Sequence, residues 1–178
     1  LKTDTLPKLT GKLYAGIKFS TDGTSCALAV ACRTKDNAIF VEAIGCHPTR
    51  DGSGWLLDFL SKADLAAVAV DGASGQQLLA DAMKAAHLRS PVLPTVKQVI
   101  TANAAFEQAL FAQALCHAGQ PGLAQAASNC EKRAIGSNGG FGYRSLTEGG
   151  HIELLDSVIL AHWQCAEGKG KRRQRIRY

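Results

Sequence analysis

The chain opens with three short apolar segments joined by tight turns, and this pattern limits its possible folds more than any other feature. The segments run from Leu13 to Phe19, from Cys26 to Cys32 and from about Ala38 to Gly45. The first link contains Asp22-Gly23, a favoured hairpin turn because glycine adopts positive φ and aspartate tolerates it. We therefore predict three consecutive antiparallel strands at the start of the domain.

After these segments the pattern changes to an alternation of helix-length stretches and short apolar runs. The run 65–70 is continuously apolar, which is typical of a strand covered on both faces, so we place it centrally in the sheet. We predict a further strand at 91–95, helices at 55–60, 76–87, 101–117 and 151–166, and a candidate hairpin within 124–144. This order favours an α/β domain with a mixed sheet and helices on both faces, which suits a ribonuclease-H-like sheet.

The length of 178 residues fits one domain, which we place at residues 12–167. No apolar run approaches the roughly 20 residues of a membrane helix, and the start has no signal-peptide layout, so we expect a soluble intracellular protein. Residues 168–178 are expected to form a flexible basic tail that either binds nucleic-acid phosphates or only adds solubility. Its cations are Lys169, Lys171, Arg172, Arg173, Arg175 and Arg177.

The cysteines and histidines give no signal for a structural metal or a disulfide framework. The six cysteines include no C-x-x-C pair and are irregularly spaced, so we interpret most of them as small buried hydrophobic residues. The five histidines form no ligand spacing. The chemistry is therefore expected to lie in the carboxylates.

Asp71 is the most informative single residue, because it is ionisable and follows the apolar run 65–70 directly. One interpretation makes it a functional carboxylate at the carboxyl end of a strand. A second makes it the N-cap of the helix that begins near Ser74 or Gly75. A third takes 71–75 as a phosphate-binding turn, although the G-x-G-x-x-G pattern is absent.

Glu153 and Asp156 form the second group of candidate carboxylates. They stand three residues apart in the last predicted helix and therefore share one face. Asp156 lies beside the apolar stripe that contains Leu155 and Ile159, where a carboxylate is unfavourable unless it is paired or bound to a cation. The alternative, exposure to solvent near the helix N-terminus, fits Glu153 better than Asp156.

The order of these motifs resembles the nuclease domains of phage terminase large subunits, which are members of the ribonuclease-H-like superfamily. The resemblance extends over roughly residues 12–167. It depends on four segments: the opening hairpin Gly16-Ile17-Lys18-Phe19-Ser20-Thr21-Asp22-Gly23, the strand end Val68-Ala69-Val70-Asp71-Gly72, the stretch Ile135-Gly136-Ser137-Asn138-Gly139-Gly140-Phe141-Gly142, and His151-Ile152-Glu153-Leu154-Leu155-Asp156.

The resemblance implies a divalent-metal-dependent endonuclease that cuts concatemeric double-stranded DNA. Two Mg²⁺ or Mn²⁺ ions about 4 Å apart would activate water and stabilise the leaving oxygen. In such enzymes carboxylates of the first strand, the fourth strand and the last helix hold the metal, positions that correspond here to Lys18, Asp71, and Glu153 or Asp156.

The resemblance also implies partners and a location. The chain has no G-x-x-x-x-G-K-[ST] motif and begins at Leu1, so we expect a domain of a longer protein whose ATPase domain lies elsewhere. The implied partners are double-stranded DNA, that ATPase domain, the small terminase subunit and the portal, with no membrane partner. The implied location is the host cell cytoplasm.

Lys18 departs from the family pattern, because an aspartate is usual at this position of the first strand. One hypothesis is that the Lys18 ammonium replaces one metal cation and stabilises phosphate charge, while Asp71, Glu153 and Asp156 hold a single ion. A second is that Asp22 supplies the missing carboxylate. A third is that Lys18 points to solvent and cleavage is weak or lost, which leaves a non-catalytic DNA-binding or portal-docking module as the competing function.

Overall fold

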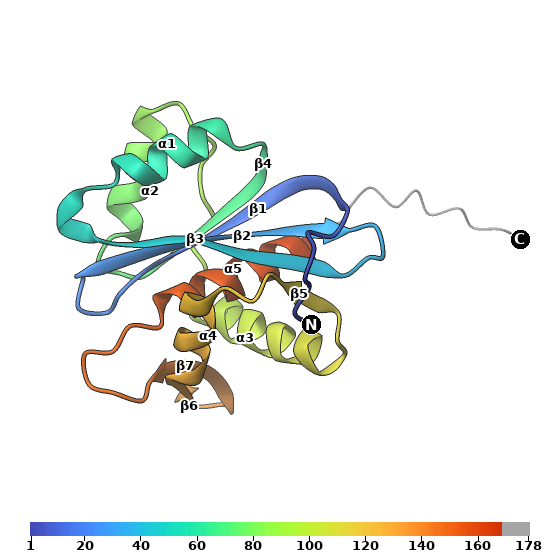
Figure 1. The fold of residues 1–178 in the computed structure, drawn as a ribbon. Helices are drawn as coiled ribbons and strands as arrows, with labels where there is room; N and C mark the ends of the chain where they lie inside the picture. The colour runs from blue at the N-terminus through green and yellow to red at the C-terminus, as the bar shows by residue number, and fades with distance from the viewer. Residues whose placement is uncertain (169–178) are drawn as a thin grey trace, which may run out of the picture.

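A computed structural model describes residues 1–168 of the chain and shows a five-stranded mixed sheet in the order β4-β1-β2-β3-β5 (Figure 1). β1, β2 and β3 pair in antiparallel fashion, whereas β4 is parallel to β1 and β5 is parallel to β3. The predicted antiparallel opening and mixed sheet are therefore confirmed. The strands are β1 (Leu9–Phe19), β2 (Ser25–Thr34), β3 (Ile39–Pro48), β4 (Leu65–Asp71) and β5 (Leu115–His117).

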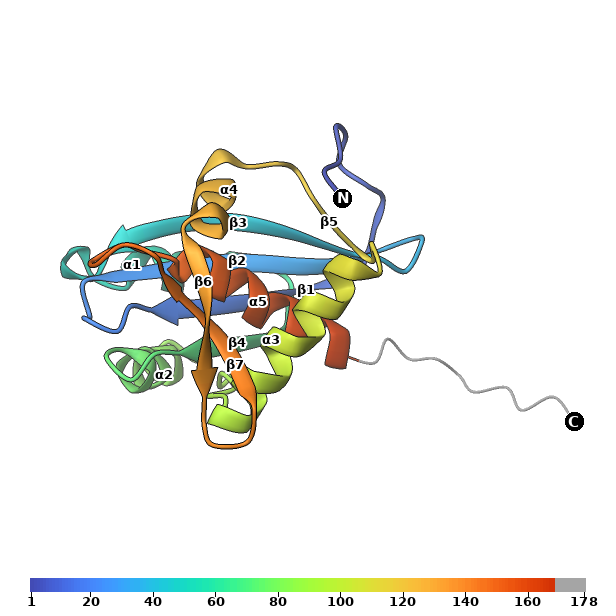
Figure 2. The same ribbon diagram turned by 90° about the horizontal axis from the view of Figure 1, so that it is seen from below.

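Helices cover both faces of this sheet, as the sequence predicts (Figures 1 and 2). On one face lie α1 (Gly54–Lys62), which follows the short 3-10 turn η1 (Thr49–Asp51), and α2 (Gln76–Ala85). On the other lie α3 (Val96–Phe111), α4 (Pro121–Ser128) and α5 (Glu153–Glu167). The predicted hairpin is present as β6 (Cys130–Ile135) and β7 (Gly140–Ser145), and it packs beside α3.

Two hydrophobic cores follow from the alternation of side chains along the strands. Ile17 of β1 and Val70 of β4 point into the core beneath α1 and α2. Ala69 points to the opposite face and joins the core that contains Trp163 of α5. Lys18 and Asp71, one residue further along their strands, therefore lie on the α5 face.

Gly16 allows α5 to lie directly on β1. A Cβ at this position would be 2.1 Å from Ser157 O and 2.5 Å from Ala161 N, far inside van der Waals contact. Only glycine permits this separation between the strand and the helix backbone. The first turn of α5 is therefore held close to the carboxyl end of β1.

The structure corrects three expectations about these elements. β4 is the outermost strand rather than a central one. Its outer edge bonds to the Arg89 side chain and to Val92, which forms an isolated bridge instead of the predicted strand at 91–95. The fifth strand is β5, inside the segment predicted as helix 101–117, because α3 ends at Phe111 and the backbone turns at Gln113 with φ 53°.

The segment before β1 is tied to β5, because Thr3 N donates to His117 O at 2.9 Å and His117 N donates to Leu1 O at 3.1 Å. The predicted basic tail lies outside the described residues, apart from Gly168. Among residues 1–168, the helices are too short or too polar to cross a bilayer.

Candidate functional site

Lys18 and Asp71 form an ion pair at the carboxyl ends of two neighbouring parallel strands. The two residues are register partners in β1 and β4, and Lys18 Nζ donates a hydrogen bond to Asp71 Oδ2. Their side chains are 21% and 19% exposed, so both charges are largely removed from water. The helix α2 begins after Gly75 with no side-chain cap, so the interpretation of Asp71 as an N-cap is wrong.

Asp156 brings a second carboxylate to this ion pair from the first turn of α5. Burial raises the pKa of Asp156 to about 7, against the lowering effect of Lys18, while Asp71 and Glu153 raise it further. A shift caused by these groups requires that they lie near Asp156. The structure therefore brings together Lys18, Asp71 and Asp156, which the sequence analysis singled out separately.

Glu153 is buried, so the alternative in which it faces solvent is wrong. It is only 8% exposed, and its Oε2 atom is buried without a hydrogen bond. Oε2 lies 3.3 Å from Nδ1 of His151, which also lies 3.3 Å from Ser25 Oγ. The Glu153 carboxylate thus faces His151 at the start of α5 and lies one helical turn from Asp156.

Asp22 has a clear local role in the turn between β1 and β2. Its Oδ1 atom accepts hydrogen bonds from Ser20 Oγ at 2.7 Å, Thr24 N at 3.0 Å and Thr24 Oγ1 at 2.7 Å. These bonds, led by the one from Ser20, lower the pKa of Asp22 to about 2. Oδ1 therefore already accepts three hydrogen bonds within the turn. A role of Asp22 as a metal ligand stays a prediction.

Arg133 is a residue of this site that the sequence analysis missed. It projects from β6 and lines a pocket of about 280 Å³ together with Lys18, Asp71, Thr21 and Ser74. It also lowers the pKa of Asp156, although less than burial raises it. The only signal in the sequence was a basic residue within a candidate hairpin, and nothing there indicated that the hairpin would face the ends of β1 and β4.

The carboxylates do not fit a metal centre in their present arrangement. Among residues 1–168, no group of three or more His, Cys, Asp or Glu side chains is placed to hold an ion. In addition, the Lys18 ammonium group is bound to Asp71 Oδ2, an oxygen that a metal would need. The predicted ligands Asp71, Glu153, Asp156 and Asp22 therefore stay a prediction.

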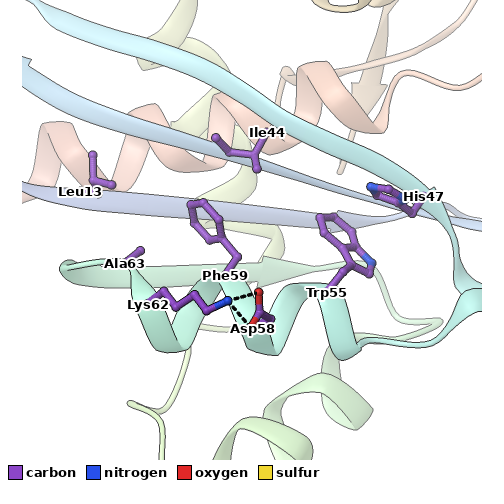
Figure 3. A pocket seen from close by; sticks show the side chains of 8 residues that line it. All are labelled: Leu13, Ile44, His47, Trp55, Asp58, Phe59, Lys62 and Ala63. Carbon is purple, nitrogen blue, oxygen red and sulfur yellow. Dashed lines mark hydrogen bonds and ion pairs between the residues drawn. The ribbon is translucent and has the colours of Figure 1, made fainter.

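A wider pocket, of about 490 Å³, lies on the opposite face, between α1 and the strands β1 and β3 (Figure 3). Trp55 and Phe59 line it, and the Trp55 ring lies 4.4 Å from that of His47. Its two charged side chains, Asp58 and Lys62, pair with each other at 2.7 Å. We assign the chemistry to the smaller pocket, because Lys18, Asp71 and Arg133 line it and all three charges act on the nearby Asp156, whose pKa is raised.

Comparisons of sequence find no relatives for this chain: no protein-family model and no curated protein matches it. Comparison of structure finds three similar phage proteins. The HK97 bacteriophage large terminase aligns with a TM-score of 0.68 at 16% identity, over 90% of this chain. The large terminase nuclease from thermophilic phage G20c aligns with a TM-score of 0.62 at 15% identity, over 86% of this chain and 82% of its own.

The third is a large terminase nuclease domain from a Thermus phage, with a TM-score of 0.59 at 16% identity over 90% of this chain and 83% of its own. The chain spans 41% of the length of the HK97 terminase. At these identities the likeness concerns the fold. The chain therefore has the ribonuclease-H-like fold of phage large terminase nuclease domains, as the resemblance implied.

Proposed function

We propose that this domain hydrolyses phosphodiester bonds in double-stranded DNA, as the nuclease domain of a DNA-packaging terminase large subunit that cuts concatemeric DNA. The observation that supports this most is the meeting of Lys18, Asp71 and Asp156 at the carboxyl ends of β1 and β4. The fold supports it as well, because the similar structures are described as large terminases or their nucleases.

The side chains at the site suit phosphodiester hydrolysis near neutral pH. A carboxylate with a pKa of about 7 is partly ionised there, so an Asp156 oxygen can accept the proton of an attacking water. Lys18 Nζ can donate a hydrogen bond to a non-bridging phosphate oxygen, where negative charge develops. Asp71 holds the Lys18 ammonium in place for this task.

Mg²⁺ or Mn²⁺ is retained as the proposed activator, on the basis of the resemblance. Carboxylate oxygens of Asp71, Glu153 and Asp156 are the hard ligands that such ions prefer. A complete site requires Lys18 to release Asp71, because the described residues hold no ion-binding cluster while that pair is intact. We therefore derive no reaction step through a metal.

The second candidate function is a non-catalytic module that binds DNA or docks on the portal. The Lys18–Asp71 pair favours it, because an internal cation neutralises a carboxylate that a metal would otherwise bind. Either function places the domain among the same proposed partners: DNA, a terminase ATPase domain, the small terminase subunit and the portal. Either also places it in the host cell cytoplasm.

Nicking of supercoiled plasmid by carboxylate variants tests the proposed site. Asp71→Asn and Asp156→Asn should each lower the nicking rate about 10²-fold or more, the usual effect of removing a general base or its partner. Asp58→Asn is the matched control, because this exposed carboxylate lies on α1 and only pairs with Lys62. Nicking that survives in both site variants would place the reaction elsewhere in the chain.

A further inference from the structure

We propose that Lys18 and Arg133 form a phosphate-binding site that holds one backbone phosphate of DNA without a divalent metal. The proposal rests on the proposed function, since that function supplies DNA as the ligand. It assigns a role to the β6–β7 hairpin, and it concerns binding of the phosphate alone, while Mg²⁺ or Mn²⁺ stays the proposed activator of cleavage.

The pocket has the composition of an anion site. It measures about 280 Å³ and lies between the ends of β1 and β4 and the strand β6. Two cationic side chains, Lys18 and Arg133, line it from opposite elements, and the hydroxyl-bearing Thr21 and Ser74 line it as well. Asp71 is the one carboxylate among its lining residues, and it is already paired with Lys18.

Lys18 retains donors for a ligand while it is bound to Asp71. An ammonium group has three N–H donors, and among the described residues only Asp71 accepts from Lys18. Two donors are therefore open to the pocket. The carboxylate fixes the position of the ammonium, which lowers the entropic cost of binding an anion there.

Arg133 differs from the other cations of the hairpin. Lys132 pairs with Glu107 at 2.5 Å, and Arg144 pairs with Glu131 at 2.7 Å. Within residues 1–168, Arg133 makes no ion pair, and only its Nε donates, to Tyr143 O at 3.4 Å. Its two terminal nitrogens can therefore bind the oxygens of a phosphate in the planar geometry that guanidinium favours.

The charges around the pocket agree with an anionic ligand. Lys18 and Arg133 contribute two positive charges, and Asp71 contributes one negative charge. A phosphodiester, with a single negative charge, compensates the remaining positive charge.

Binding of a short fluorescein-labelled DNA duplex to the full chain, measured by anisotropy in the presence of a chelator, tests this site. Arg133→Ala should weaken binding about tenfold, the loss of one charge-assisted contact. It should also reduce the slope of log K against log salt by about 0.9. Arg144→Ala is the matched control, because it removes the same charge from the same hairpin outside the pocket, and it should change affinity about twofold or less.

Lys18→Met tests the second cation and should weaken binding by a similar factor, with a thermal melt to verify that the variant folds. Equal losses in Arg133→Ala and Arg144→Ala would overturn the proposal, because they would indicate a general charge effect. Binding that appears only when Mn²⁺ replaces the chelator would overturn it too. Failure of the nuclease proposal is separate, because it shows as DNA that is bound but not nicked.

Discussion

Lys18 is the residue that most affects the chemistry proposed for this domain. By the resemblance it stands where an aspartate is expected, and it forms an ion pair with Asp71 beside Asp156. Of the three hypotheses for Lys18, the structure argues against the one in which its ammonium points to solvent. The pair instead gives the site an internal cation, which favours the hypothesis that the ammonium takes the place of one metal ion.

Lys18→Asp should convert the site into one that binds a divalent ion. The substitution places a third carboxylate beside Asp71 and Asp156 and removes the competing ammonium. We expect Mn²⁺ to bind the variant about tenfold or more tightly than the wild type, since one added carboxylate contact is worth at least about 1.4 kcal/mol. Calorimetric titration with Mn²⁺ measures this, and equal affinities in the two proteins would show that Lys18 does not occupy the ion position.

The pKa of Asp156 predicts how the rate of cleavage depends on pH. If the ionised carboxylate accepts the proton from water, the nicking rate should rise about tenfold per pH unit below 7 and level off above it. The profile is measured with the wild type in buffers of constant ionic strength. A rate that falls as the pH rises through 7 would exclude Asp156 as the base.

The same pKa predicts an effect on stability. A carboxyl whose pKa is raised from 3.8 to about 7 on folding binds its proton more tightly in the native state. The free energy of unfolding of the protein therefore falls as the pH rises from about 4 to about 7. Asp156→Asn should raise the melting temperature at pH 8 and change it little at pH 4, as measured by scanning calorimetry. The same increase at both pH values would mean that the ionisation of Asp156 is not the cause.

At the scale of elements, the contact between α5 and β1 positions the site. Gly16→Ala should destabilise the domain by about 2 to 4 kcal/mol, because its Cβ would lie 2.1 Å from Ser157 O and would push the helix away. Gly54→Ala is the control: its Cβ would meet nothing within 4 Å and it begins α1, so stability should change by less than about 1 kcal/mol. Urea denaturation measures the free energy of unfolding of both variants. Equal values for the two would contradict the close contact between α5 and β1.

The sequence predicts the elements of this fold better than their arrangement. Short apolar segments and the Asp22-Gly23 turn predict β1 to β3, and the apolar run before Asp71 predicts β4. The edge position of β4 could not be predicted, because covering helices and a bridge at Val92 bury an edge strand as a neighbouring strand would. β5 was missed because its three residues, Leu115, Cys116 and His117, follow an alanine-rich helix and continue its pattern.

The residues of the site, too, could be predicted better than their arrangement in space. Lys18, Asp71 and Asp156 were found because each is an ionisable group beside an apolar segment, which is unfavourable without a partner. Their mutual contacts depend on strand register and on the helix position that Gly16 permits, and neither is visible in local sequence. Arg133 reaches the site through the tertiary position of the β6–β7 hairpin, which the sequence pattern does not encode locally.

At the scale of the whole molecule, DNA binding is expected to combine the site with the basic tail. Deleting residues 169–178 removes six cations and should lower the slope of log K against log salt by up to about five, with weaker binding at low salt. The Arg133→Ala effect should persist in the shortened protein, because its contact is local. Anisotropy at several salt concentrations measures both, and an unchanged slope would exclude the tail from the DNA contact.

The most direct test of the central claim is nicking of supercoiled plasmid by the wild-type protein, compared in Mg²⁺, Mn²⁺ and chelator. The protein's DNA binding is verified in the same preparation. We predict metal-dependent conversion to nicked and linear DNA, with loss of both products in chelator. Absence of cleavage in every condition while the DNA remains bound would contradict the nuclease and identify the domain as a binding module.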